Sequence, residues 1–240
     1  MKKLCLLLLL FLSHFLLMPL ETTHAKGKQE PVPDTVADSH SKYTAYFQTN
    51  SGRYCTAILI SSTAALTARH CVGREPAERV GTIYPGQNGD KRPFGYMNIR
   101  TYIPNPNPNY DIAILKGTER DQDEFYKYYI RKFSTTVKGY TDEEFRTFMG
   151  QDAYAYGYPH GKQFRNNVQY RSDGKITSYK TKPIPYLLTD MPAFSGQSGS
   201  GVFKKDGKFL GIMVTRTKKN TANILPFTES IAKWINENAK

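Results

Sequence analysis

Hydrophobic residues fall in short runs along most of the chain, and from Tyr43 onward these runs are rich in β-branched and aromatic residues. Turn residues separate one run from the next, a pattern typical of short β-strands. Many short strands at close spacing with little helix predict an all-β barrel or sandwich. We expect strands at residues 54–59, 79–84, 96–103, 111–115, 153–158, 168–170, 176–179, 202–203 and 209–214.

Local signals add turns and helices to this pattern. The pairs Asp173-Gly174 and Asp206-Gly207 lie between predicted strands, and each favours a tight hairpin turn. A capping pattern at Thr141 predicts a short helix over 141–149. One-sided apolar spacing predicts a C-terminal helix over 226–239.

The N-terminus has the layout of a secretory signal peptide. Lys2 and Lys3 precede an apolar run over 4–20, and small residues precede a predicted cut after Ala25. The alternative is a retained membrane anchor, but the run is shorter than a usual membrane span and contains polar residues. We expect residues 1–25 to be removed, the protein to be secreted, and no membrane association afterwards.

Residues 26–42 are polar and poor in apolar side chains, unlike the chain after Tyr43. Such a composition buries too little apolar surface to order itself. The segment is interpreted as a disordered leader or propeptide, and we expect further trimming before Tyr43 to activate the protein.

The net charge of +12 favours anionic partners such as cell-wall polymers, acidic proteins or nucleic acid. The Lys and Arg residues are scattered rather than gathered in a binding motif. We therefore interpret them as a solvated basic surface and expect no nucleic-acid partner.

Cysteine usage fits an exported protein. Cys5 lies in the signal run, so the exported chain keeps Cys55 and Cys71. Two cysteines in such a chain predict one disulfide, worth roughly 3 kcal/mol in the chain-entropy model; the alternative is two free buried thiols. Two cysteines and the lack of a His-x-x-x-His pair fall short of a zinc site. We expect neither metal nor cofactor.

Candidate chemistry begins at Ser198, which has glycines on both sides in the run 194–201. Flanking glycines let the backbone turn tightly and leave N–H groups to donate to an oxyanion. Ser/Gly runs are also common in flexible linkers. Here the run lies between apolar segments 186–188 and 202–203, which favours a nucleophile.

A serine nucleophile needs a general base, usually a histidine held by a carboxylate. The exported chain contains His40, His70 and His160. His40 falls in the polar leader and His160 in a predicted loop, whereas His70 lies beside Cys71, whose disulfide would hold its loop. His70 is therefore the predicted base.

Asp111 is the predicted acid, because it opens an apolar strand where an unpaired carboxylate is costly. An α/β-hydrolase would need a histidine after Ser198, and none follows. A subtilisin-like order would need an acid from the polar leader, Asp34 or Asp38. The order His70, Asp111, Ser198 remains.

At these residues the chain resembles the chymotrypsin-like serine proteases. The resemblance rests on Thr67–Cys71, Asp111–Leu115 and Gly196–Ser200. The bacterial glutamyl endopeptidase and exfoliative toxin branch is the closer match. Further similarity to that branch lies at Tyr156–Pro159, Lys162, Gly174–Thr177 and Trp234–Asn238.

The resemblance runs from about residue 43 to the C-terminus. It implies two six-stranded β-barrels, at about 43–135 and 136–240, followed by the C-terminal helix. It implies that the triad lies between the barrels and that the N–H groups of Gly196 and Ser198 form an oxyanion hole. It also implies a protein or peptide substrate, and we expect a monomer.

The S1 pocket departs from the family. Glutamyl-specific members have a histidine after a Gly-Ile pair and a threonine five positions before the serine; this chain has Met213 and Ala193. Pro192 stands where trypsin-like enzymes carry an acid. We assign Pro192, Ala193, Met213 and Thr215 to the S1 wall and expect uncharged, medium-sized apolar side chains at P1.

Two functions follow from these observations. The favoured one is a secreted serine endopeptidase that forms an acyl-enzyme on Ser198. The alternative is a binding protein on a protease scaffold that uses its basic surface to hold an anionic partner, because fold alone does not decide function.

Overall fold

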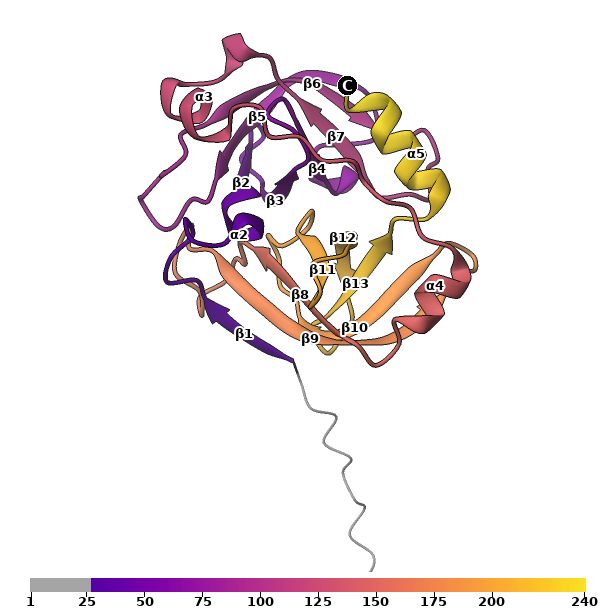
Figure 1. The fold of residues 1–240 in the computed structure, drawn as a ribbon. Coiled ribbons are helices and arrows are strands. Elements are labelled where there is room, and N and C mark those ends of the chain that lie inside the picture. The colour runs from indigo at the N-terminus through magenta and orange to yellow at the C-terminus, as the bar shows by residue number, and fades with distance from the viewer. Residues whose placement is uncertain (1–26) are drawn as a thin grey trace, which may run out of the picture.

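The computed structural model describes residues 27–240 and consists mainly of strands in two antiparallel sheets (Figure 1). One sheet is a closed barrel with strand order β2-β3-β4-β7-β6-β5. We call it the first barrel. Its strands are β2 (Thr44–Thr49), β3 (Tyr54–Leu59), β4 (Ala64–Thr67), β5 (Ala77–Pro85), β6 (Met97–Pro104) and β7 (Ala113–Lys116).

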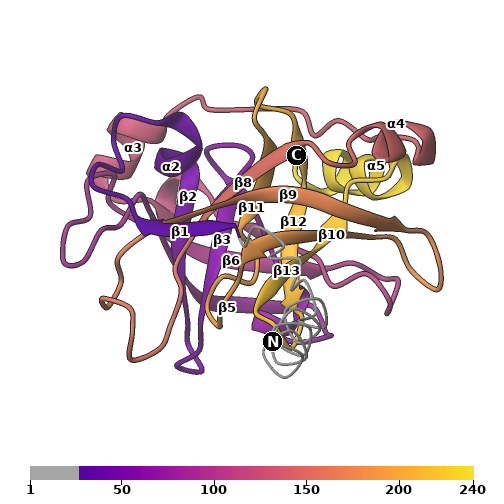
Figure 2. The same cartoon turned by 90° about the horizontal axis from the view of Figure 1, so that it is seen from below.

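The other sheet has the order β1-β9-β10-β13-β12-β11-β8, and an additional pairing of β8 with β9 closes six of its strands into the second barrel. The seventh strand, β1, lies along β9 (Figure 2). The prediction of two six-stranded barrels is confirmed. The strands are β1 (Lys28–Pro31), β8 (Asp152–Gly157), β9 (Tyr170–Lys180), β10 (Tyr186–Pro192), β11 (Gly201–Lys204), β12 (Phe209–Arg216) and β13 (Thr221–Pro226).

Helices are short and lie around the barrels. The capping box predicted at Thr141 begins α4, and the predicted C-terminal helix is α5, whose apolar face belongs to the cluster that fills the first barrel. Within residues 27–240, no helix is both long and apolar enough to cross a membrane. The helices are α2 (Ser39–Tyr43), α3 (Glu124–Ile130), α4 (Asp142–Thr147) and α5 (Glu229–Asn238), with 3-10 turns η1 (Arg69–Cys71) and η2 (Glu119–Asp121).

Each barrel is filled by the inward residues of its strands. In β2, Ala45 and Phe47 point into the first barrel and are fully buried. Tyr46 lies between them and faces outward, as the period of two along a strand requires. A second cluster, which includes Ile176 and Ile224, fills the second barrel.

The expectation of a disordered leader over 26–42 is wrong. Within this segment the chain forms β1 and most of α2, and it buries Val32 and Ser41. The strand forms because β9 offers an edge for backbone hydrogen bonds, which does not require apolar side chains. The predicted signal peptide lies outside the described residues, and removal of the segment over 26–42 stays a prediction.

The hairpin predicted at Asp173-Gly174 is also wrong, because β9 runs through both residues without a turn. A Cβ atom at Gly174 would lie 2.4 Å from a side-chain oxygen of Asp190, so the glycine allows close packing against β10. The hairpin at Asp206-Gly207 does connect β11 with β12. The sequence patterns do not predict the strands β1, β2, β4, β10 and β13 or the helices α2 and α3.

Candidate active site

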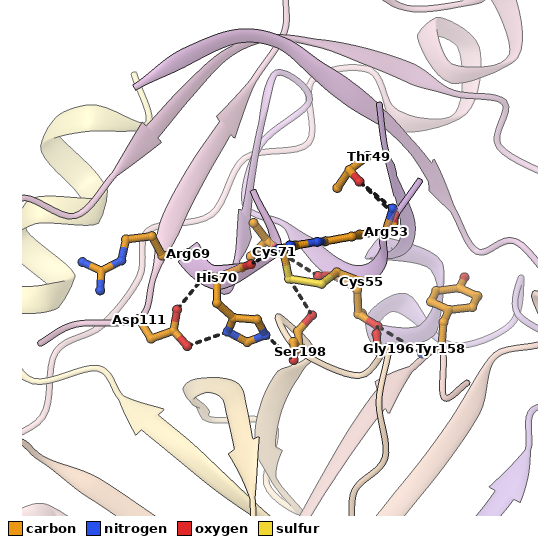
Figure 3. Close-up of a disulfide and its surroundings, with 12 residues drawn as sticks. Thr49, Arg53, Cys55, Arg69, His70, Cys71, Asp111, Tyr158, Gly196 and Ser198 are labelled. Carbon is orange, nitrogen blue, oxygen red and sulfur yellow. Dashed lines mark hydrogen bonds and ion pairs between the residues drawn. A yellow bond between two sulfur atoms is a disulfide. The ribbon is translucent and has the colours of Figure 1, made fainter. Parts of the chain in front are cut away.

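The three predicted triad residues come from different elements and meet between the barrels (Figure 3). His70 lies in η1, Asp111 precedes β7, and Ser198 lies in the loop between β10 and β11. His70 Nδ1 is 2.7 Å from Asp111 Oδ2, and His70 Nε2 is 2.9 Å from Ser198 Oγ. The His70 backbone N–H also donates to Asp111 Oδ1 at 2.9 Å.

This geometry suits proton transfer from the serine. With Nδ1–H donating to the carboxylate, Nε2 is left to accept the hydroxyl proton of Ser198. Burial of the Asp111 carboxyl raises its pKa, but the hydrogen bonds and charge of His70 outweigh burial and bring the pKa below its ordinary value. Asp111 therefore stays ionised at neutral pH.

Two side chains that were not identified from the sequence hold the turn that carries His70. The buried hydroxyl of Tyr102 donates to the carbonyls of Arg69 and Gly73, at 3.0 and 2.6 Å. Arg69 donates to the carbonyls of Asn107 and Pro108 in the loop before Asp111. These contacts link the segments that carry the acid and the base.

The predicted disulfide between Cys55 and Cys71 is present. It joins β3 to the turn that carries His70. Cys55, Cys71 and His70 also form the group of potential metal-ligand atoms found within the described residues, all within 4.8 Å of one another. Both sulfurs are in the disulfide and offer no thiolate, so these residues do not fit a metal ion.

Gly196 shapes the backbone before Ser198. Its φ of +93° is in the left-handed region, and a Cβ atom there would lie 2.3 Å from the carbonyl oxygen of Tyr158. The hydroxyl of Thr56 donates to the Gly196 carbonyl at 2.8 Å, and the N–H of His160 donates to the Ser195 carbonyl at 2.6 Å. These bonds tie both carbonyls to neighbouring segments of the two barrels.

The backbone N–H groups of Gly196 and Ser198 belong to the same loop as the Ser198 hydroxyl. Across residues 27–240, neither N–H donates a hydrogen bond to the protein. Two such N–H groups can stabilise an oxyanion that develops on a bound carbonyl. The arrangement is compatible with the oxyanion hole that the family resemblance implies.

The side chain of Gln197 is fully buried behind this loop. Its Oε1 accepts from the Phe194 N–H at 2.9 Å and from Nε2 of Gln29 in β1 at 3.0 Å. Gln29 and Gln197 both donate to the hydroxyl of Ser172, at 2.7 and 3.3 Å. The N-terminal strand therefore contacts the residue that precedes Ser198, a connection that no local sequence signal indicates.

A cavity of about 330 Å³ lies beside Ser198 and is the candidate S1 pocket. Of the predicted wall residues, Ala193, Met213 and Thr215 line it, whereas Pro192 does not. Ala193 and Met213 are buried and apolar. The exposed Arg216 also lines the cavity, and its guanidinium bonds to the side chain of Asn220 rather than to an inner residue.

Comparisons with known proteins agree with this architecture. A family model described as "Trypsin-like peptidase domain" matches residues 55–212. A curated protein of Bacillus subtilis (strain 168), named "Extracellular metalloprotease", is 26% identical over 169 residues, which cover 66% of this chain and 49% of that protein. The chain thus spans about half the length of this relative.

Solved structures share the fold. A Glu endopeptidase in complex with MPD superposes with a TM-score of 0.70 and 22% identity, covering 87% of this chain and 95% of that chain. The protease Anisep from Arthrobacter nicotinovorans superposes with a TM-score of 0.64 and 16% identity, covering 88% and 99%. At these identities the likeness establishes the two-barrel fold.

Proposed function

The chain belongs to the trypsin-like peptidase family and is a serine peptidase, and on that premise we propose that it is a secreted endopeptidase with Ser198 as its nucleophile. The observation that carries the proposal is the series of hydrogen bonds from Asp111 through His70 to Ser198. In the same loop, the N–H groups of Gly196 and Ser198 donate no hydrogen bond within residues 27–240. The substrate is a protein or peptide, and the enzyme acts as a monomer without a cofactor.

The geometry supports acyl transfer in two stages. Ser198 Oγ attacks the scissile carbonyl carbon while His70 Nε2 takes the hydroxyl proton, and Asp111 stabilises the imidazolium. The N–H groups of Gly196 and Ser198 hold the oxyanion. His70 then protonates the leaving amine, and the acyl-enzyme remains on Ser198. Water activated by His70 releases the acid and restores the serine.

The related Bacillus protein is named a metalloprotease, yet this chain is better suited to serine chemistry. The group with metal-ligand spacing among residues 27–240 is occupied by a disulfide. Treatment with a chelator should leave activity intact, whereas a fluorophosphonate should abolish it by modifying Ser198.

For the S1 pocket we propose a preference for uncharged, medium-sized apolar side chains. One structural neighbour is titled a Glu endopeptidase, but a pocket that selects glutamate needs polar or cationic partners to offset desolvation of the carboxylate. Ala193 and Met213 supply neither, and Arg216 bonds to Asn220. A cleavage-site profile on a mixed peptide library tests this; dominant cleavage after Glu would contradict it.

Labelling with a fluorophosphonate probe tests the proposed function. The wild-type protein should be labelled once, at Ser198, and Ser198→Ala should not be labelled. Ser230→Ala, at an exposed serine on α5, is the matched control and should be labelled like the wild type. A folded wild-type protein that neither reacts with the probe nor cleaves peptides would instead support the binding-protein alternative.

A further inference from the structure

A row of tyrosine rings crosses the outer face of the first barrel. Tyr54 in β3, Tyr46 in β2, Tyr84 in β5 and Tyr96 just before β6 form this row, which we call the aromatic ladder. Successive ring centroids are 5.5, 6.4 and 6.2 Å apart. The register explains the alignment, because Tyr46 is paired directly with Tyr84 across the sheet.

The ladder begins at the catalytic cleft. Tyr54 precedes Cys55, whose disulfide reaches the residue after His70. The Tyr54 ring centroid lies 6.1 Å from that of His160. The His160 N–H donates to the Ser195 carbonyl in the loop between β10 and β11 that carries Ser198, which we call the oxyanion loop. A cavity of about 270 Å³ opens here, lined by Tyr46, Tyr54, Tyr158, Pro159, His160, Gly161, Phe164, Arg165, Asn166 and Asn167.

This cavity and the S1 cavity lie on different sides of the oxyanion loop. The S1 cavity is lined by Asp111 and Ala193, whereas the second cavity is lined by Tyr158 and His160. In Figure 3, Gly196 and Tyr158 lie on the side of Ser198 opposite Asp111. A substrate whose acyl residue fills the S1 cavity therefore sends its leaving segment toward Tyr54 and the ladder.

Cationic side chains accompany the rings. The Arg92 guanidinium lies 4.1 Å from the Tyr84 ring centroid, Arg165 lines the cavity, and Arg53 reaches over the disulfide to the His70 carbonyl. All three are exposed, and within residues 27–240 none forms an ion pair. Among the described residues that line the cavity, none carries a carboxylate.

We propose that the aromatic ladder is an extended binding surface for the substrate polypeptide on the C-terminal side of the scissile bond, and that it selects segments carrying aromatic and acidic side chains. The proposal rests on the proposed peptidase function. Tyr54 and Tyr96 are 43% and 37% exposed, so both ends of the ladder offer ring surface to a ligand. Incoming rings pack on these faces, and the three arginines attract carboxylates and repel basic segments.

Paired substrates test the proposal. A short substrate ends at the scissile bond in a chromogenic leaving group, and a long one carries the same acyl residues followed by a segment with one aromatic and several acidic residues. We expect the ratio of kcat/KM for long over short to fall about fivefold or more in Tyr54→Ser, Tyr96→Ser and Arg92→Ser. Tyr128→Ser, at a 69% exposed tyrosine on α3, is the matched control and keeps the wild-type ratio.

For a long substrate whose leaving segment contains only glycine and serine, the ratio of kcat/KM for long over short should already be as low in the wild-type protein as it is in the variants. An unchanged ratio in Tyr54→Ser, Tyr96→Ser and Arg92→Ser, with both substrates cleaved, would overturn the proposed binding surface while leaving the peptidase function intact. Loss of binding to an acidic polysaccharide in those variants, with no change in the peptide ratio, would also overturn it.

A binding measurement separates the two proposals. Fluorescence anisotropy of the labelled acidic, aromatic peptide with Ser198→Ala protein needs no catalysis. Added ladder substitutions should weaken binding about fivefold or more, and added Tyr128→Ser should not. If the wild-type protein cleaves neither substrate and is not labelled, the peptidase function fails, and this binding series still decides whether the ladder recognises the peptide.

Discussion

The two barrels hold their parts of the candidate site in different ways. On the first barrel, the turn that carries His70 is held by the Cys55–Cys71 disulfide and the Tyr102 hydroxyl, and Arg69 holds the loop before Asp111. On the second, the Ser198 loop is held by hydrogen bonds within its own barrel, such as those between Gly199 and Met213, and in addition by groups outside that barrel.

The Ser198 loop accepts hydrogen bonds from two residues outside the second barrel, Thr56 and Gln29. Thr56 in β3 of the first barrel bonds to Gly196 through its hydroxyl and to the Ser198 carbonyl through its N–H, at 2.8 and 2.9 Å. Gln29 in β1 reaches Gln197. The proposed base and acid are thus held within one barrel, whereas the proposed nucleophile and oxyanion donors depend on both barrels and on the N-terminal strand. Four predictions test this difference.

The largest effect on activity is expected from removing one member of the proposed triad, either Ser198 on the second barrel or His70 on the first. Ser198→Ala and His70→Ala should each lower kcat by roughly a millionfold, because triad members act as a unit. For the same reason, the double variant should be no slower than either single one. Steady-state kinetics measure this, with circular dichroism to show that the fold is retained. Full activity in pure Ser198→Ala protein would end the assignment.

The disulfide should affect mainly the first barrel. The native protein should contain no alkylatable thiol by mass analysis. Replacing Cys55 and Cys71 together with alanine should lower the free energy of unfolding by about 3 kcal/mol, the loop-closure value. Thermal unfolding measures the loss. Hydrogen exchange should rise first in the turn around His70 and later around Ser198. If hydrogen exchange rose around Ser198 before it rose around His70, the result would contradict the expectation that the disulfide stabilises mainly the first barrel.

The N-terminal strand should affect mainly the second barrel. Gln29→Ala removes hydrogen bonds to Gln197 and Ser172, each worth about 1 kcal/mol, so kcat should fall about tenfold with little change in KM. Glu30→Ala is the matched control, because Glu30 is the next residue and its side chain forms a surface ion pair with Lys28.

Deletion of residues 26–42 extends the same test. We expect it to lower activity further, because it removes β1 together with α2. A deleted protein that is as active as the full chain, or more so, would contradict this role and would instead support the expectation that trimming before Tyr43 activates the protein.

The smallest effect concerns His40 in α2, which joins the N-terminal segment to the second barrel. Its ring stacks on Phe203 at 3.8 Å between centroids, and Nδ1 bonds to the Tyr154 hydroxyl at 2.7 Å. Burial lowers the pKa of His40 below 6.5, and the positive charge of Arg171 acts the same way, against the opposing effect of Asp38.

The unfolded chain therefore binds a proton more readily than the folded protein, so stability is full above about pH 6.5 and falls as pH drops toward the folded pKa. His40→Phe should reduce this acid-side loss, measured as the difference in Tm between about pH 8 and about pH 5. Ser39→Ala, at an exposed neighbour, should keep it. An undiminished loss in His40→Phe would show that other groups cause it.

Local chemistry was sufficient for several features that the structure contains. The strand over 54–59, the cap at Thr141 and the turn at Asp206-Gly207 were predicted from neighbouring residues. Catalytic candidates could also be found, because few residue types can act as nucleophile, base and acid, and because their order along the chain excludes rival hydrolase folds. The composition of the exported chain likewise predicted one disulfide.

Only the tertiary structure decided where the remaining backbone found its partners. Residues 27–42 look unstructured because their side chains are polar, yet β9 supplies hydrogen bonds that composition does not reveal. Asp173-Gly174 continues a strand because β8 pairs with it and β10 packs against it. Gln29 meets Gln197 across 168 residues of sequence. Hydrogen-bond partners so distant along the chain leave no periodic signal, so they follow from packing alone.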